Sequence, residues 1–153
     1  MVELSNNLLY ENMNGVDLLI EPVSTDTVDE YVIRIVQTQD TCQAKFEVKP
    51  SSYSKSRIII YIYAEGSSTV DCVCTLNVPR DIEGVETDIQ IRSWPFDDSR
   101  IQARPEMFIK NSNIVATHGN ALGSINAEQK YYLATKGVDD YKQLIKESLL
   151  EDA

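Results

Sequence analysis

The sequence predicts a mainly β chain that ends in α-helical segments, and three observations support this prediction. Apolar and polar residues alternate strictly along several segments, as in residues 43–48, where Ala44, Phe46 and Val48 point to one side. Such segments recur at intervals of roughly 10–15 residues, with no convincing helix between neighbours. After residue 126 the apolar residues repeat at helical spacing instead. The strand spacing is compatible with a sandwich, a barrel or a β-helix, and periodicity does not choose among them.

Strand-like segments fill most of the chain before residue 117. Residues 1–14 show no firm period, so we expect an irregular or weakly helical lead-in, and residues 16–23 are a possible first strand that Pro22 stops. Further strands are predicted at residues 31–36, 43–48, 57–64, 69–78, 85–92, 107–109 and 114–116. Residues 97–100 are predicted to form a loop, and Pro105 limits the strand that follows it. Both faces of the strand at residues 57–64 carry large apolar side chains, so we expect both to be at least partly covered.

Two helices are predicted at the C-terminal end. Asn126 and Gln129 form a capping box for a helix that runs to about Lys136, and Gly137 supplies its stop. Asp139 is the expected cap of a second helix that runs to about residue 150. An apolar stripe follows one side of this second helix: Tyr141, Leu144, Ile145 and Leu149. Such a stripe most often packs on its own domain, and the alternative is that it faces a partner.

The totals indicate one domain over residues 1–153, with a β core at about 16–118 and a helical segment at about 126–151. The formal net charge of -10 repels phosphate groups, so neither nucleic acid nor an anionic membrane surface is an expected partner. No apolar run approaches the roughly 20 residues of a membrane span. With three cysteines, an odd number, and no visible signal peptide, we expect a reducing, cytoplasmic location.

The sequence offers few residues for chemistry. Cys72 and Cys74 share one face of a strand about 7 Å apart, which suits metal ligation, but the same face carries apolar residues, so core packing is favoured. His118 is the single histidine and has no acid or cysteine within four residues, which favours a hydrogen-bonded structural role. Gly119 and Gly123 beside it indicate tight turns or close approach. Because we find no nucleophile, metal triad or cofactor loop, we expect no enzyme.

Three blocks in the last third nevertheless resemble one known family in order and spacing. They are residues 103–109, which contain Pro105, residues 117–123, which contain the His118-Gly119 pair, and residues 131–138. Residues 103–150 are similar to the C-terminal part of the SufB/SufD family, the scaffold subunits of the Suf iron–sulfur cluster assembly system. The resemblance implies a right-handed parallel β-helix followed by helices that bind the SufC-type ABC ATPase.

The same resemblance implies roles for individual residues. In SufD-like members the histidine at the position of His118 is implicated at the SufB–SufD interface, where the nascent cluster is thought to form. An imidazole there can bind iron, or change the charge of the interface at about pH 6–7. The motif glycines are Gly119, Gly123 and Gly137, and the candidates for partner binding are Tyr131, Tyr132, Leu133, Tyr141, Leu144 and Ile145. We expect no stably bound cofactor, and at most a transient iron–sulfur cluster.

The chain departs from the SufB pattern in one informative way. SufB-like members carry a functional cysteine before the histidine motif, and the corresponding place here is near Ser99, with no cysteine after Cys74. Our hypothesis is therefore a short SufD-like scaffold or accessory subunit. Its expected partners are a SufC-type ATPase and either a SufB-like scaffold or a second copy of this chain. The alternative is an interaction or dimerisation protein of the same fold without metal or cluster chemistry.

Overall fold

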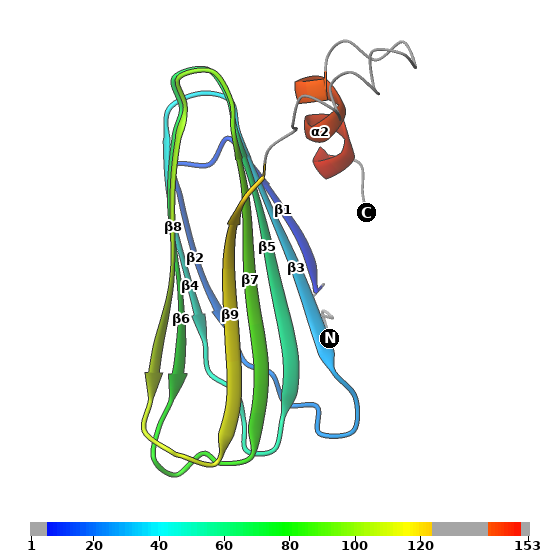
Figure 1. Ribbon diagram of the computed structural model, residues 1–153, viewed down its shortest axis with the longest axis vertical. Coiled ribbons are helices and arrows are strands. Elements are labelled where there is room, and N and C mark those ends of the chain that lie inside the picture. The colour runs from blue at the N-terminus through cyan, green and yellow to red at the C-terminus, as the bar shows by residue number, and fades with distance from the viewer. Residues whose placement is uncertain (1–5, 124–140, 151–153) are drawn as a thin grey trace.

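The structure is a computed structural model that describes residues 6–123 and 141–150. The described part of the chain consists of nine strands and one helix, α2 (Figure 1). The strands are β1 (Asn7–Glu11), β2 (Gly15–Ile20), β3 (Asp29–Gln37), β4 (Thr41–Val48), β5 (Lys55–Ala64), β6 (Thr69–Val78), β7 (Val85–Pro95), β8 (Arg100–Ile109) and β9 (Ile114–Leu122), and the helix is α2 (Tyr141–Leu150).

The strands form two parallel sheets that the chain enters alternately. The five-stranded sheet has the order β1-β3-β5-β7-β9, and the four-stranded sheet has the order β2-β4-β6-β8. Each strand is therefore paired with the strand one turn earlier, and every pairing is parallel. This topology is a parallel β-solenoid of about four turns. It confirms the predicted β-helix and rules out the sandwich and the barrel that periodicity left open.

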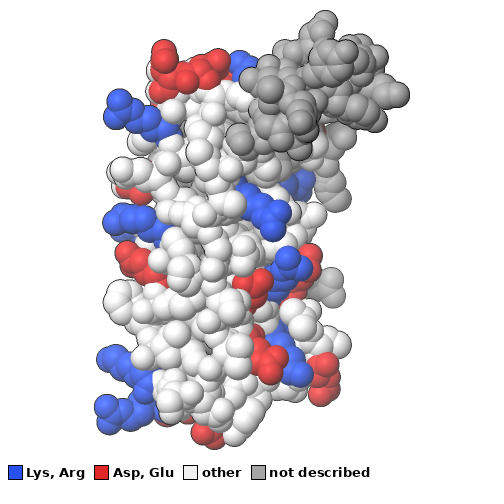
Figure 2. Space-filling model, viewed as in Figure 1, with Lys and Arg blue, Asp and Glu red and all other residues white. Residues whose placement is uncertain are grey.

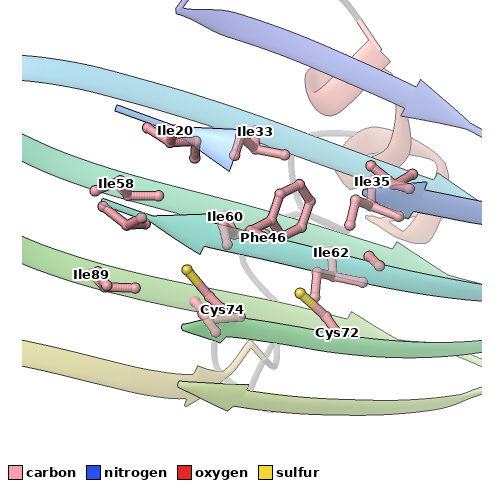
Figure 3. Packing of buried hydrophobic residues seen from close by; sticks show 14 of the residues in the cluster. Ile20, Ile33, Ile35, Phe46, Ile58, Ile60, Ile62, Cys72, Cys74 and Ile89 are labelled. Carbon is pink, nitrogen blue, oxygen red and sulfur yellow. The ribbon is translucent and has the colours of Figure 1, made fainter. Parts of the chain in front are cut away.

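The core is a set of side-chain columns that run along the solenoid. The parallel register places Ile33, Ile60 and Ile91 in line, one from each successive turn of the five-stranded sheet. On the opposite sheet Phe46 lies next to Cys74 in the register. All of these side chains are buried, and Figure 3 shows Ile33, Ile60 and Phe46 pointing into the space between the sheets. β-branched residues suit such columns because they pack well on a pleated surface.

The central strands were predicted correctly, but the end strands were not. The irregular or weakly helical lead-in expected at residues 1–14 is wrong, because residues 7–11 form β1, which pairs with β3. The last two strands are also longer than predicted: β8 begins at Arg100, inside the expected loop, and β9 extends to Leu122. Pro105 lies within β8, which is an edge strand of the described sheet, where proline is tolerated.

Of the two predicted helices, the structure describes the second. The helix expected at residues 126–136, with its stop at Gly137, lies outside the described residues. α2 packs on the outer face of the five-stranded sheet, near the ends of the strands that lie uppermost in Figure 1. Its Leu149 is buried against Val36 and Tyr63, so this part of the predicted apolar stripe does pack on its own domain. Within the described residues no helix is both long and apolar enough to cross a membrane.

Candidate functional site

His118 lies on β9, on the side of the strand that continues the solenoid core. The register pairs His118 with Ile89 of β7, and it pairs Asn120 with Ile91. Ile89 and Ile91 are fully buried, because the next turn covers them. β9 has no neighbour on its outer edge among the described strands, so both polar side chains are exposed. Two isoleucine columns of the core thus end in an imidazole and an amide at an open end of the solenoid.

The open end is hollowed between β8 and β9. A hollow of about 590 Å³ contains His118, and its lining residues are Ala103, Arg104, Pro105, Glu106, His118, Gly119 and Asn120. Asn120 Nδ2 donates a hydrogen bond of 2.7 Å to the carbonyl of Ala103, which ties β9 to β8 across the mouth of the solenoid. Figure 2 shows that the face with β8 and β9 in front is broadly uncharged, with charged side chains along both of its sides.

A second hollow of about 560 Å³ continues along the same two strands. Asn120 borders both hollows, and Ser93 lines the second one at 4% exposure. The hydroxyl of Ser93 has no hydrogen-bond partner among the described residues. The open end therefore combines polar groups with unfilled space, whereas the turns beneath it are closed by apolar side chains.

The neighbouring residue Thr117 points to the outer face and ties β9 to β7. Its hydroxyl donates a 2.7 Å hydrogen bond to Asp88 Oδ1, which also accepts one of 2.8 Å from Gln90 Nε2. Burial by itself would raise the pKa of Asp88, but these two hydrogen bonds and the Arg57 charge outweigh it and lower that pKa. Asp88 therefore stays ionised at neutral pH and anchors the strand that carries His118.

Two motif glycines, Gly119 in β9 and Gly123 directly after it, are sites of close approach. Gly119 lies beside Gln90 of the preceding turn, and a Cβ atom at Gly119 would overlap the amide of that side chain. Gly123 is equally close to the indole of Trp94. Trp94 in turn stacks on Tyr61, with ring centroids 6.0 Å apart. The glycines thus leave room for side chains of β7 that lean towards the last strand.

The structure places all three cysteines of the chain in the core. Cys42, Cys72 and Cys74 have no exposed surface, and Figure 3 shows the latter two among the core isoleucines. Burial raises the pKa of each thiol, to about 12 for Cys74. A metal ligand or nucleophile must be a thiolate, so these thiols are poorly suited to either role in this fold. The described residues also contain no group of three histidine, cysteine or acidic side chains placed to hold a metal ion.

Ser99, near which the resemblance implies the place of the SufB-type cysteine, has a structural role in the turn before β8. Its hydroxyl donates hydrogen bonds to the carbonyl groups of Ala64, at 3.1 Å, and Phe96. The side chain is half-buried. Ser99 therefore holds the turns of two successive coils together.

α2 is fixed to the solenoid by contacts that the sequence did not indicate. Lys146 Nζ lies 2.7 Å from Glu65, and Lys142 Nζ lies 3.3 Å from Glu65 and 3.1 Å from Asp97. Arg34 Nη1 donates a 2.8 Å hydrogen bond to the carbonyl of Leu149. One signal was available: Tyr61 and Tyr63 face away from the isoleucine column of β5, which indicates that something covers that face, as predicted.

The candidates for partner binding on α2 differ in how far their side chains are exposed. Leu144 is 45% exposed, whereas Ile145 is half-buried and packs towards the domain beside Leu149. Tyr141 begins α2. Tyr131, Tyr132, Leu133 and Gly137 lie outside the described residues.

Fold and site together define a class of protein: a parallel β-solenoid with an open, polar-edged end and a C-terminal helix docked on its side. The sequence matches the family model for the SufBD core domain of the SUF system for FeS cluster assembly over residues 15–143. The chain therefore belongs to the SufB/SufD core family, a family of scaffold and accessory proteins of iron–sulfur cluster assembly. The match begins far upstream of the three blocks that first indicated it. No curated protein matches the chain in sequence.

Proposed function

We propose that this chain is a SufD-like scaffold or accessory subunit that acts in a complex with a SufC-type ATPase and a second scaffold chain. The observation that carries the proposal is the position of His118, which is exposed at the open end of the solenoid in a chain of the SufBD core family. An iron–sulfur cluster would be the cargo of such a complex.

The chemistry of the open end supports a SufD-like role over a SufB-like one. Cluster assembly on a scaffold needs thiolate ligands, and every cysteine of this chain is buried with a raised pKa. An imidazole also suits iron, and His118 offers one at a surface where a partner can add further ligands. The edge of β9, which no described strand covers, and the uncharged band beside it in Figure 2 favour cover by another scaffold chain, either SufB-like or a second copy.

Anaerobic reconstitution of the complex tests the role of the histidine. We expect His118→Ala to lower the yield of assembled cluster, measured by visible absorption and by iron and sulfide content. Val115→Ala is the matched control, because Val115 lies on the same strand, is 62% exposed and points to the outer face. An unchanged yield in His118→Ala would remove the histidine from the proposed function.

A second candidate is an interaction protein of the same fold that performs no metal chemistry. The burial of all three thiols favours it, as does the lack of a three-ligand group among the described residues. This candidate predicts that His118→Ala leaves the stoichiometry of the complex intact and that iron never co-purifies in stoichiometric amount with any assembly containing the chain.

A further inference from the structure

The two ends of the described solenoid carry opposite charge. The first coil, residues 6–28, contains β1 and β2 and has four acidic residues with no lysine or arginine, a formal charge of -4. The last coil, residues 99–123, contains β8 and β9, and its three basic residues against the single acidic Glu106 give +2 with His118 neutral. The last coil is thus a basic end in a chain whose formal net charge is -10. Two first coils repel each other, whereas a first coil and a last coil attract.

The first coil ends the core in apolar side chains. Leu8, Tyr10 and Leu18 pack against the core from this coil and are only partly buried. Figure 1 shows β1 and β9 at opposite edges of the five-stranded sheet, and no described strand lies beyond either of them. The apolar columns of the solenoid therefore stop at an acidic end that has no described neighbour.

The register of the chain's own turns shows how a second copy would continue the solenoid. One row of outward side chains crosses the four-stranded sheet, namely Asp17, Lys45, Val73 and Arg104. A second copy whose β2 lay beside β8 in this register would place its Asp17 next to Arg104. Within the chain Asp17 already lies next to a basic residue of the following turn, Lys45, so the junction would repeat an existing pairing.

The inward columns of the same two sheets also continue. Val16 and Ile20 of the second copy would follow Ala103 and Met107, which are partly buried residues of β8 that pack on the core. In the other sheet Tyr10 of the second copy would lie beside Leu122, which is 69% exposed in the single chain. Stacking would therefore remove apolar surface from water at both coils.

The backbone groups at the two ends match as well. Alternate residues of a parallel strand direct their N–H and C=O groups to opposite neighbours. The Asn12 N–H donates to the Val36 carbonyl and the Gly123 N–H to the Ser93 carbonyl, so odd-numbered residues of β1 and even-numbered residues of β9 face the free edges. In the register above, N–H groups of Asn7, Leu9 and Glu11 of the second copy would meet the carbonyls of His118, Asn120 and Leu122.

Pro105 makes this junction weaker than the turns inside the chain. The N–H groups of Arg100 and Lys110 bond to β6, so odd-numbered residues of β8 face the free edge. Pro105 is one of these and has no N–H to donate. The junction would lack one ladder hydrogen bond, and we therefore expect it to form reversibly.

We propose that the chain associates with itself head to tail, with the first coil of one copy stacked on the last coil of the next and Asp17 paired with Arg104. Such a contact leaves one free end of each kind, so further copies can add. The stacked coil would also cover the hollow that contains His118, which leaves that side chain accessible only on the last copy of a stack. The association needs neither an ATPase nor a cluster, and so goes beyond the proposed function.

Sedimentation velocity of the full chain at low salt, from about 1 μM to about 100 μM, tests the inference. We expect the mean mass to rise with concentration and to pass that of a dimer. Asp17→Lys and Arg104→Glu should each weaken the association by about fivefold or more. An equimolar mixture of the two variants should regain it, because the altered first coil of one variant then meets the altered last coil of the other.

Arg80→Glu and Asp81→Lys are the matched controls. They make the same changes of charge at exposed positions in the turn between β6 and β7, and they should stay within about twofold of the unmodified chain. Circular dichroism checks that every variant is folded. A chain that stays monomeric throughout would overturn the inference and leave the proposed function standing. So would a mixture that regains nothing, or a loss confined to Arg104→Glu, which would instead indicate pairing of two last coils.

Discussion

Glu65 is the carboxylate on which the docking of α2 depends most. Its side chain is 15% exposed, and its two oxygens lie 2.7 Å from Lys146 Nζ and 3.3 Å from Lys142 Nζ. Replacing Glu65 by Gln keeps the shape but removes the charge, which leaves Lys146 without the carboxylate closest to it. Exposed ion pairs contribute about 0.2–1 kcal/mol, and breaking fully buried ones costs about 3–5 kcal/mol. For this partly buried cluster we expect Glu65→Gln to lower the free energy of unfolding by about 1–3 kcal/mol.

Asp97→Asn is the matched control, because Asp97 shares Lys142 with Glu65. Its distance to that lysine is a similar 3.1 Å, but its side chain is 46% exposed, so solvent screens the charge. An asparagine oxygen can still accept the 3.0 Å hydrogen bond from the Gly66 N–H. We therefore expect a clearly smaller loss of stability than for Glu65→Gln.

The pH dependence supplies an independent check on Glu65. Burial alone would raise the pKa of Glu65, but hydrogen bonds and charges from Lys146 and Lys142 outweigh it and lower that pKa. A lowered pKa stabilises the fold above the unfolded value of about 4.3 and loses this contribution as pH falls through the folded value. The difference between the unmodified chain and Glu65→Gln should therefore be full at pH 7 and shrink as the pH falls below about 4.3.

Urea unfolding followed by Trp94 fluorescence measures both effects, because Trp94 packs in the hydrophobic cluster that contains Leu149 of α2. Circular dichroism of the same samples shows whether the solenoid unfolds together with this cluster or after it. Equal losses for Glu65→Gln and Asp97→Asn, or a Glu65→Gln effect that persists unchanged at pH 3, would refute the electrostatic account of α2 docking.

Two further predictions follow from the site. Gly123→Ala should destabilise the fold by about 1–3 kcal/mol and change the fluorescence of Trp94, since the new methyl group overlaps a rigid indole. Gly119→Ala should lower the free energy of unfolding by less, because the flexible end of Gln90 can move aside. Equal unfolding midpoints for the two variants would contradict this explanation. The three buried thiols should resist a thiol-reactive disulfide reagent in the folded chain and react rapidly in urea, as followed by absorbance; rapid reaction of the folded chain at neutral pH would show that the core opens more readily than its packing implies.

The sequence predicts the middle of this fold better than its ends, for a physical reason. Strict alternation arises where one face of a strand is covered by apolar neighbours, as along β6, whose inward residues are all fully buried. The end strands have cover from one side only, so their inward positions need not be large and apolar. In β9 these positions include Ala116, His118 and Asn120, which leave little alternation to detect.

Long-range contacts explain most of what the sequence did not reveal about the site. The apolar stripe of α2 was visible, and the tyrosines of β5 indicated that the outer face of the sheet is covered. The ion pairs, however, join Lys142 to Asp97 and Lys146 to Glu65 across 45 and 81 residues. No local pattern pairs residues at such distances. The β-helix itself was likewise indicated by the family resemblance, because local periodicity does not show which strands pair.

The polar residues that end the isoleucine columns protect the end of the fold, and they also leave a ligand-capable side chain exposed there. An apolar residue at the position of His118 would complete the column and leave a hydrophobic surface beside an unpaired strand edge, which invites uncontrolled pairing. Asn120 protects this end without help from His118, because its amide donates a hydrogen bond to the Ala103 carbonyl and so joins β9 to β8. With that closure made by its neighbour, the imidazole of His118 is not needed to join the two strands. The same arrangement that protects the end of the fold therefore leaves one ligand-capable side chain exposed at the open end, where the proposed second scaffold chain would cover the edge.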